Sequence, residues 1–466
     1  MSSKQYLRPT GAFAFGLFAT LASQVAGAQD SSDEAMSKSS TTDWSNASGL
    51  LEAMGANFND AQFMKRHNLK IGGWIETSVS TNTNSSPDNF NGTITFNDRD
   101  GELQLNQFYV WLQKEVEVNG DRFDIGGRFD FMYGSDAIFT QAYGTTALDP
   151  QTGQPLNRGH WDLHLTGHDD RFYSIALPQA YVEVNVPIGN GLSVVAGHFY
   201  TPIGFEVVTS PDNFFVTKPY TFQYGEPFTH TGFLGSYEFN QNWKVIAGAV
   251  TGSVTGGWDG NFDRQLGNWD FLGGVTWTSD DENSSLTLTS SAGGRSEHSS
   301  SAWAIYSIVG AHNFTDKFHY VFQHDHGFAE DVLTAHGNGN TETAEWYGIN
   351  QYLFYDIQEN LSAGVRAEWW RDANGFRVAG PTRCGASFNV DNTPAGGSTY
   401  ACGASAGNYP FAGSDYYALT VGMSYTPVPW MILRPNLRYD HADIPVFDTG
   451  RRHNQLLITA DMVITF

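Results

Sequence analysis

The last eleven residues of the chain, 456–466, constrain its fold more than any other stretch. Apolar residues alternate there with a set that includes Thr459, Asp461 and Thr465. A two-residue period is typical of a β-strand with two unlike faces, here one suited to lipid and one to water. A strand that ends the chain on an aromatic residue, Phe466, leaves no open edge in a bilayer if it pairs with the first strand. We therefore predict a transmembrane β-barrel.

The composition agrees with a barrel and argues against helical spans. The chain of 466 residues contains 50 Gly, 33 Phe, 21 Tyr and 13 Trp, and only 16% of its residues are charged. Polar and aromatic residues with many turn glycines are typical of outer-membrane barrels. Beyond residue 28 the sequence has no run of about eighteen uncharged apolar residues, the length that a helical span needs. Strands are therefore the expected spanning elements.

The first 28 residues have the pattern of an export signal. Lys4 and Arg8 precede an apolar stretch at residues 12–21, and small residues lead up to Ala28, after which we predict cleavage. Removal of this leader takes away two of 25 basic residues and none of 49 acidic ones, so the net charge changes from −24 to −26. Such acidity excludes nucleic acid as a partner. It suits either long hydrated loops or a lumen that favours cations.

Residues 29–68 are expected to form a flexible periplasmic segment with one short helix, ahead of a barrel domain at residues 69–466. The first part of this segment is rich in Ser, Asp and Thr and has no apolar period. Leu50, Leu51, Met54 and Phe58 would then share one helical face. This helix either caps the periplasmic mouth as a small plug or forms a loosely packed turn.

Alternating segments predict about sixteen antiparallel strands in an up-and-down barrel, with short periplasmic turns and long extracellular loops. The predicted strands are residues 69–80, 103–115, 123–133, 177–186, 192–200, 229–239, 243–251, 270–278, 284–292, 302–312, 318–326, 344–355, 361–371, 416–426, 431–440 and 455–466. Sixteen strands leave room for an aqueous channel unless something fills it. Three long loops, residues 134–176, 201–228 and 372–415, are the candidates to fold inward and narrow it.

Several segments resemble a known family. They are GWIET at residues 73–77, AGHFYTPIGFE at 196–206, Tyr347 and Gly348 ahead of a strand, RAEWWRD at 366–372 and RPNLRYD at 434–440. Together they make the chain similar to the OmpL-like putative β-barrel porins of Gram-negative outer membranes. The resemblance spans nearly all of the chain after the leader. It implies an outer-membrane porin and names no solute.

Charged and polar residues on the faces opposite the apolar ones are expected to line the lumen. They are Glu76, Arg128, Asp130, Glu183, Arg366, Glu368, Arg434, Asn436, Arg438 and Asp440. One hypothesis is a polarised lumen, with a basic patch of Arg366, Arg434 and Arg438 on one wall and the acids Glu76, Asp130 and Glu183 elsewhere. The other is a ladder of ion pairs that satisfies buried charge and stiffens the barrel. The sequence leaves both open.

Sequence signals for metal binding or catalysis are weak. A metal site would draw on His160, His164, His168, Asp169 and Asp170, or on Asp98, Asp100 and Glu102, but neither group has an established ligand spacing, and hydrated loops explain both. His324 and His326 lie near the end of a predicted strand, and we interpret them as exposed residues at a loop. No Ser, His and carboxylate constellation can be assembled. We expect no enzyme, no metal and no cofactor.

The sequence therefore predicts a cell outer-membrane porin for passive diffusion of small hydrophilic solutes or ions. The alternative is a structural or adhesin-like barrel whose lumen is closed by its loops. Membrane lipid is the expected surrounding, and a homotrimer is possible by analogy with other sixteen-stranded porins. Cys384 and Cys402, the two cysteines of an exported chain, are expected to form a disulfide.

Overall fold

A computed structural model describes residues 47–85, 89, 91–142, 173–253, 266–296, 299–333, 340–378, 413–448 and 450–466. Its helical elements are α2 (Leu50–Ala53), η1 (Phe58–Asp60), α3 (Gln62–His67), α4 (Ala137–Thr140), η2 (Ser210–Asp212) and η3 (Thr221–Gly225). Its strands are β1 (Leu69–Asn82), β2 (Leu103–Lys114), β3 (Asp124–Gly134), β4 (Ser174–Ala176), β5 (Ala180–Val186), β6 (Leu192–Tyr200), β7 (Thr229–Asn240), β8 (Trp243–Thr251), β9 (Trp269–Thr278), β10 (Ser284–Ser296), β11 (Ser299–Thr315), β12 (Phe318–Leu333), β13 (Thr341–Gln358), β14 (Leu361–Asp372), β15 (Ser414–Val428), β16 (Met431–Ala442) and β17 (Asn454–Thr465).

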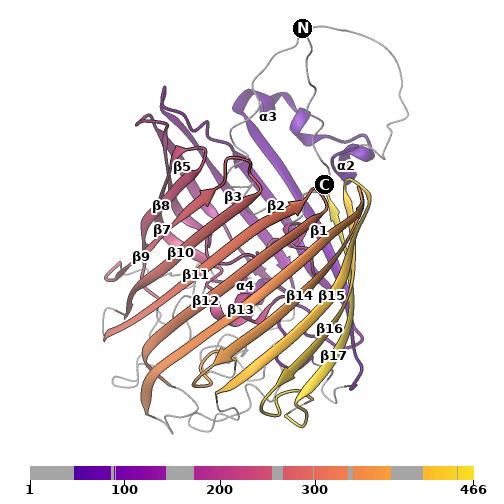
Figure 1. Ribbon diagram of the computed structural model, residues 1–466. Helices are drawn as coiled ribbons and strands as arrows, with labels where there is room; N and C mark the ends of the chain where they lie inside the picture. The colour runs from indigo at the N-terminus through magenta and orange to yellow at the C-terminus, as the bar shows by residue number, and fades with distance from the viewer. Residues whose placement is uncertain are drawn as a thin grey trace.

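The strands form one closed antiparallel barrel in which consecutive strands pair, apart from β4 and β5 (Figure 1). Pairing of β1 with β17 closes it, with Trp74 opposite Thr465 and Asn82 opposite Leu457. β4 and β5 both pair with β3 and so share one position, which gives sixteen positions around the barrel. The predicted fold class is confirmed, including the pairing of the last strand with the first.

Pro178 explains the main difference between the predicted and observed strands. The sequence predicted a continuous strand over residues 177–186, whereas the structure has β4 and β5 with a break at residues 177–179. Proline lacks the N–H that a ladder requires. The backbone of Gln179 still accepts a hydrogen bond from the N–H of Asp130 at 2.8 Å, so the break stays attached to β3.

The two faces of the strands follow the predicted alternation. On β15, Val421 is 47% exposed on the outer face, and its neighbour Thr420 is 0% exposed on the inner face. The apolar side of β17 likewise faces outward, with Ile458 exposed and Thr459 and Asp461 buried. The apolar outer surface suits lipid, and the polar inner surface provides the candidate functional site.

Short turns join the strands at the end of the barrel where α2, α3 and the C-terminus lie (Figure 1), and this end is called the turn end below. The opposite end, where the longer connections lie, is called the loop end. The predicted helix through residues 50–58 is wrong in extent, because α2 ends at Ala53. Gly55 follows with a φ of +82°, a left-handed conformation that terminates helices. Among the described residues, no helix is long and apolar enough to cross a membrane.

Candidate functional site

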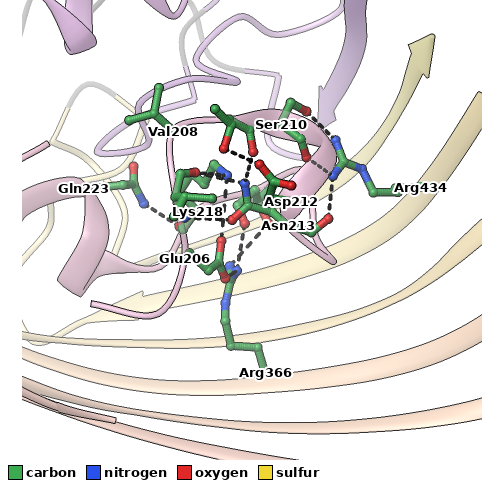
Figure 2. A network of polar contacts seen from close by, with 12 residues as sticks. Glu206, Val208, Ser210, Asp212, Asn213, Lys218, Gln223, Arg366 and Arg434 are labelled. Atoms are coloured by element: carbon green, nitrogen blue, oxygen red, sulfur yellow. Dashed lines mark hydrogen bonds and ion pairs between the residues drawn. The ribbon is translucent and has the colours of Figure 1, made fainter. Parts of the chain in front are cut away.

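Residues 201–228, called the inward loop below, fold into the barrel between β6 and β7. All of its residues are buried or half-buried, and it contains η2 and η3. Figure 2 shows side chains of the strands reaching this loop, with Arg366 and Arg434 pointing toward it from the barrel wall. Of the three long loops considered from the sequence, this is the one that the structure describes in full, and it lies in the lumen.

Arg434 of β16 holds the first half of the inward loop. Its Nη1 donates to the backbone oxygens of Ser210 at 2.7 Å and Asn213 at 2.6 Å, and its Nη2 donates to the hydroxyl of Ser210 at 2.6 Å. Its Nε donates to the carboxylate of Asp461 at 3.0 Å, and Glu76 lies 3.4 Å from Nη2. The guanidinium is buried, so these bonds replace its hydration shell.

Arg366 of β14 and Arg438 of β16 hold the second half, and Arg366 also binds the first half through Glu206. Arg366 pairs with Glu206 of the loop at 2.5 Å and donates to the backbone oxygen of Thr217 at 2.8 Å. Arg438 donates to the backbone oxygen of Lys218 at 3.0 Å. Both arginines also share the carboxylate of Glu368, at 2.8 Å and 2.9 Å. The two halves of the loop are therefore fixed to the same wall of the barrel.

The inward loop is also braced by its own side chains (Figure 2). Asn213 bonds to both the N–H and the carbonyl oxygen of Val207, at 2.9 Å each. Lys218 donates to the backbone oxygen of Val207 at 3.0 Å, and the amide of Gln223 donates to the backbone oxygen of Lys218 at 2.6 Å. These bonds make the loop a compact body rather than an open strap.

Other walls contact the same loop. Gln107 of β2 donates to the backbone oxygen of Val208 at 2.7 Å. Gln323 of β12 donates to the carboxylate of Glu226 at 2.6 Å, and Asn350 of β13 donates to the hydroxyl of Thr221 at 2.6 Å. The loop is thus anchored by hydrogen bonds from five strands: β2, β12, β13, β14 and β16.

Apolar residues from the loop end pack over the inward loop. Phe96, between β1 and β2, contacts Phe222 and Phe228 of the loop at ring-centroid distances of 5.5 and 5.8 Å. One buried cluster joins Tyr220 and Tyr224 of the loop to residues that follow β14 and β16, namely Phe376, Val378, Val446 and Phe447. Three connections at the loop end, between β1 and β2, after β14 and after β16, therefore cover the inward loop.

The remaining predicted lumen residues also lie on the inner faces. Arg128 donates to Asp130 at 2.7 Å on β3, and Glu183 of β5 accepts a hydrogen bond from Ser193 of β6 at 2.6 Å. Asp440 accepts a hydrogen bond from the Nε of Arg438 at 2.9 Å. Asn436 lies between Arg434 and Arg438 on β16, and its side chain is 3.4 Å from the hydroxyl of Thr217. The polar residues are inside, but most are bonded to one another or to the inward loop.

These contacts favour the ion-pair ladder over the polarised lumen. The predicted separation of Glu76 from the arginines is wrong, because closure of β1 on β17 brings Glu76 next to Arg434. The group contains four cations, Arg366, Arg434, Arg438 and Lys218, and five carboxylates, Glu76, Glu206, Glu368, Asp440 and Asp461. With its positive charges paired, this wall is not a basic patch.

Sequence reasoning missed Glu206, Lys218, Ser210 and Asn213, because a loop without periodicity carries no signal for burial. Asp461 was recognised as polar but not as the partner of Arg434. A signal for that pair existed, since β16 and β17 are consecutive strands and place the two residues directly opposite each other.

The other described residues considered for metal binding or catalysis lie on the outer face of the barrel or in the loop between β1 and β2. His324 bonds to the hydroxyl of Tyr306 at 3.1 Å and His326 pairs with Glu345 at 2.7 Å, on the outer face of the barrel. Asp98 is buried and lies 3.4 Å from the amide of Gln104. The part of the chain that the structure describes contains no group of three His, Cys, Asp or Glu placed to hold a metal. Residues 160–170, Cys384 and Cys402 lie outside the described residues.

A closed sixteen-stranded barrel with an apolar outer face and a loop folded into a polar lumen defines the class of outer-membrane channel barrels. The particular family follows from the sequence: a model described as putative beta-barrel porin-2, OmpL-like, matches residues 68–466. The chain belongs to this family, which confirms the resemblance seen in its motifs. No curated protein matches the sequence.

Several solved structures are similar to this chain. OprB of Pseudomonas putida, in a high-pH structure, is similar with a TM-score of 0.52 at 11% identity, covering 91% of this chain and 99% of that one. The outer membrane channel DcaP of Acinetobacter baumannii has a TM-score of 0.48 at 11% identity, covering 85% and 97%. An anion-selective porin from Comamonas acidovorans has a TM-score of 0.48 at 8% identity, covering 85% and 99%. At these identities the likeness to OprB concerns the fold alone.

Proposed function

We propose that the protein is an outer-membrane channel for passive diffusion of small hydrophilic solutes or ions. The observation that carries this proposal is the closed barrel of sixteen positions with an apolar outer face and a polar inner face. A barrel of this size encloses more space than its own side chains fill. The inward loop is fixed to one side of this space by Arg366, Arg434 and Arg438 and would narrow it.

A structural or adhesin-like barrel is the second candidate, because apolar segments of the loop end pack over the inward loop. If these contacts close the lumen at all times, the barrel would not conduct. The two functions differ in one measurable property, the conductance of the folded wild-type protein.

Planar bilayers with purified, folded protein provide the test. The channel proposal expects stepwise increases in current as single barrels insert. Folding is checked on the same sample by the mobility shift between heated and unheated protein, which reports an intact barrel. A folded protein that inserts but gives no steps would reject the channel and support the closed barrel.

We also propose the cellular setting expected from the sequence. The chain would be exported, cleaved after Ala28 and inserted in the outer membrane with the loop end outside the cell and residues 29–68 in the periplasm. The mass of the mature N-terminus, measured on protein from outer-membrane fractions, tests the cleavage. A homotrimer is our proposal for the assembly, and the molar mass of the detergent-solubilised protein distinguishes it from a monomer.

A further inference from the structure

The inner faces of β7 to β10 differ from the wall that holds the inward loop. Along the turn-end half of these strands, Ser236, Thr276 and Thr287 face inward and are partly exposed. Their direction follows from the outward neighbours Phe233, Phe271 and Leu286, which are about half exposed on the lipid side. On the opposite wall, Thr420, Arg366 and Arg438 also face inward but are fully buried.

Strand pairing places the exposed inward groups in one continuous row. Glu238 is directly opposite Lys244, Lys244 opposite Thr276, and Thr276 opposite Thr287, across β7 to β10. Lys244 lies 3.1 Å from Glu238, and the hydroxyls of Thr276 and Thr287 are 3.0 Å apart. We call these four residues the polar row. Its side chains are charged or hydroxylic, which suits contact with water and hydrophilic solutes.

The charged end of the polar row stays accessible to water. The Lys244 side chain is 19% exposed and that of Glu238 is 47% exposed, whereas the side chains of Arg366 and Arg438 are 0% exposed. Lys244 and Glu238 are paired too, but they touch the aqueous space, so the loss of either charge leaves the other one facing a passing ion. The arginines and their carboxylates are buried and do not reach that space. Toward the loop end the wall changes, and Val250 and Leu272 are buried in one apolar cluster with Ile203 and Tyr224 of the inward loop.

From this contrast, and resting on the proposed channel function, we infer that the water-filled part of the lumen follows the turn-end half of the β7 to β10 wall and that Lys244 and Glu238 set its ion selectivity. The arginine wall then fixes the inward loop and does not touch the solute. The apolar cluster around Leu272 and Tyr224 marks the loop-end boundary of the wet surface.

A matched pair of cysteine variants tests the position of the water. Thr287→Cys and Thr420→Cys are made in a chain whose two native cysteines are replaced by serine, and each folded barrel is treated with a membrane-impermeant methanethiosulfonate reagent. Both positions face inward, but only Thr287 is partly exposed. Labelling of T287C should be faster than that of T420C on the order of tenfold, and it should reduce conductance. Equal labelling rates, or labelling of T287C without a change in conductance, would overturn the inference.

Selectivity is tested separately, with the native cysteines in place. Lys244→Gln should shift the reversal potential in a salt gradient toward cations, and Glu238→Gln should shift it toward anions. Lys114→Gln is the matched control, because Lys114 shares its strand face with the outward residue Leu112 and should leave the potential unchanged. Unchanged potentials for both K244Q and E238Q would reject their role. A wild-type protein that does not conduct would reject the channel itself, while the labelling rates would still report where the water lies.

Discussion

Removal of the Arg434 guanidinium should destabilise the barrel without changing its selectivity. The side chain is 1% exposed and bonded to Asp461, to the hydroxyl and backbone oxygen of Ser210, and to the backbone oxygen of Asn213. Arg434→Gln leaves the buried carboxylate of Asp461 without its cation. Breaking one side of such a buried pair costs about 3–5 kcal/mol. The free energy of unfolding should fall by about that amount.

Urea unfolding of the protein in lipid vesicles, followed by the mobility shift of the folded barrel, measures this change. Arg122→Gln is the matched control, because Arg122 pairs with Glu117 at an exposed site where both side chains are more than half exposed, and its loss should leave the unfolding midpoint unchanged. In the double variant Arg434→Gln, Asp461→Asn, the carboxylate of residue 461 is itself replaced by a neutral amide, so it is no longer a buried charge without a counterion. The double variant should therefore lose less stability than the sum of the two single changes.

The opposite outcome would refute the reasoning. If R434Q unfolds at the wild-type midpoint and shifts the reversal potential toward cations, Arg434 faces water and the polarised-lumen hypothesis is correct. The double variant Arg434→Gln, Arg438→Gln gives a second test. The ion-pair ladder predicts a lower unfolding midpoint and an unchanged reversal potential, whereas the polarised lumen predicts a wild-type midpoint and a shift toward cations.

Three further predictions concern the lipid face, the cysteines and the loop between β1 and β2. Val421→Arg should cost about 2–4 kcal/mol if the position lies at mid-depth in the bilayer, with Val421→Leu as a near-neutral control; equal unfolding midpoints would show that Val421 does not face lipid. A Cys384–Cys402 disulfide should leave no free thiol in denatured, unreduced protein and should stabilise it by on the order of 3 kcal/mol; two titratable thiols would contradict it. Burial raises the pKa of Asp98 in this loop to about 7, and that of Asp136, which follows β3 and is linked to the loop through Asn106, also to about 7. The folded protein therefore holds protons that these carboxyls release when exposed, and the stability of the loop should fall as pH rises from about 4 to about 7 and level off above that. Hydrogen exchange at residues 91–98 measures this, and a pH dependence that persists in Asp98→Asn, Asp136→Asn would reject the assignment.

The strands and their faces were predictable because each depends on local alternation. Val421 and Thr420 differ in polarity, and a bilayer on one side and a polar lumen on the other sort them accordingly. The closure of β1 on β17 also followed from the sequence, since an open edge in lipid leaves backbone groups unpaired. Pro178 is a sequence signal for the break at residues 177–179, because proline cannot donate to the ladder.

The arrangement of the lumen was not predictable in the same way. Arg366 and Glu206 are 160 positions apart in the sequence, and no period links them. Four of the bonds that hold the inward loop go to the backbone oxygens of Ser210, Asn213, Thr217 and Lys218, which any residue would supply. Which loop enters the barrel therefore depends on the shape of the backbone, which the sequence pattern does not show.

The account depends on the lumen being an open path for hydrophilic solutes, and liposome swelling measures this directly. Vesicles that contain the folded wild-type protein are diluted into isotonic solutions of neutral sugars of increasing size, and the change in light scattering is recorded. We predict swelling that is fast for the smallest sugar and slows steadily with size, as expected for diffusion through a narrowed pore. Vesicles with the same amount of folded protein that do not swell in any sugar would contradict the account.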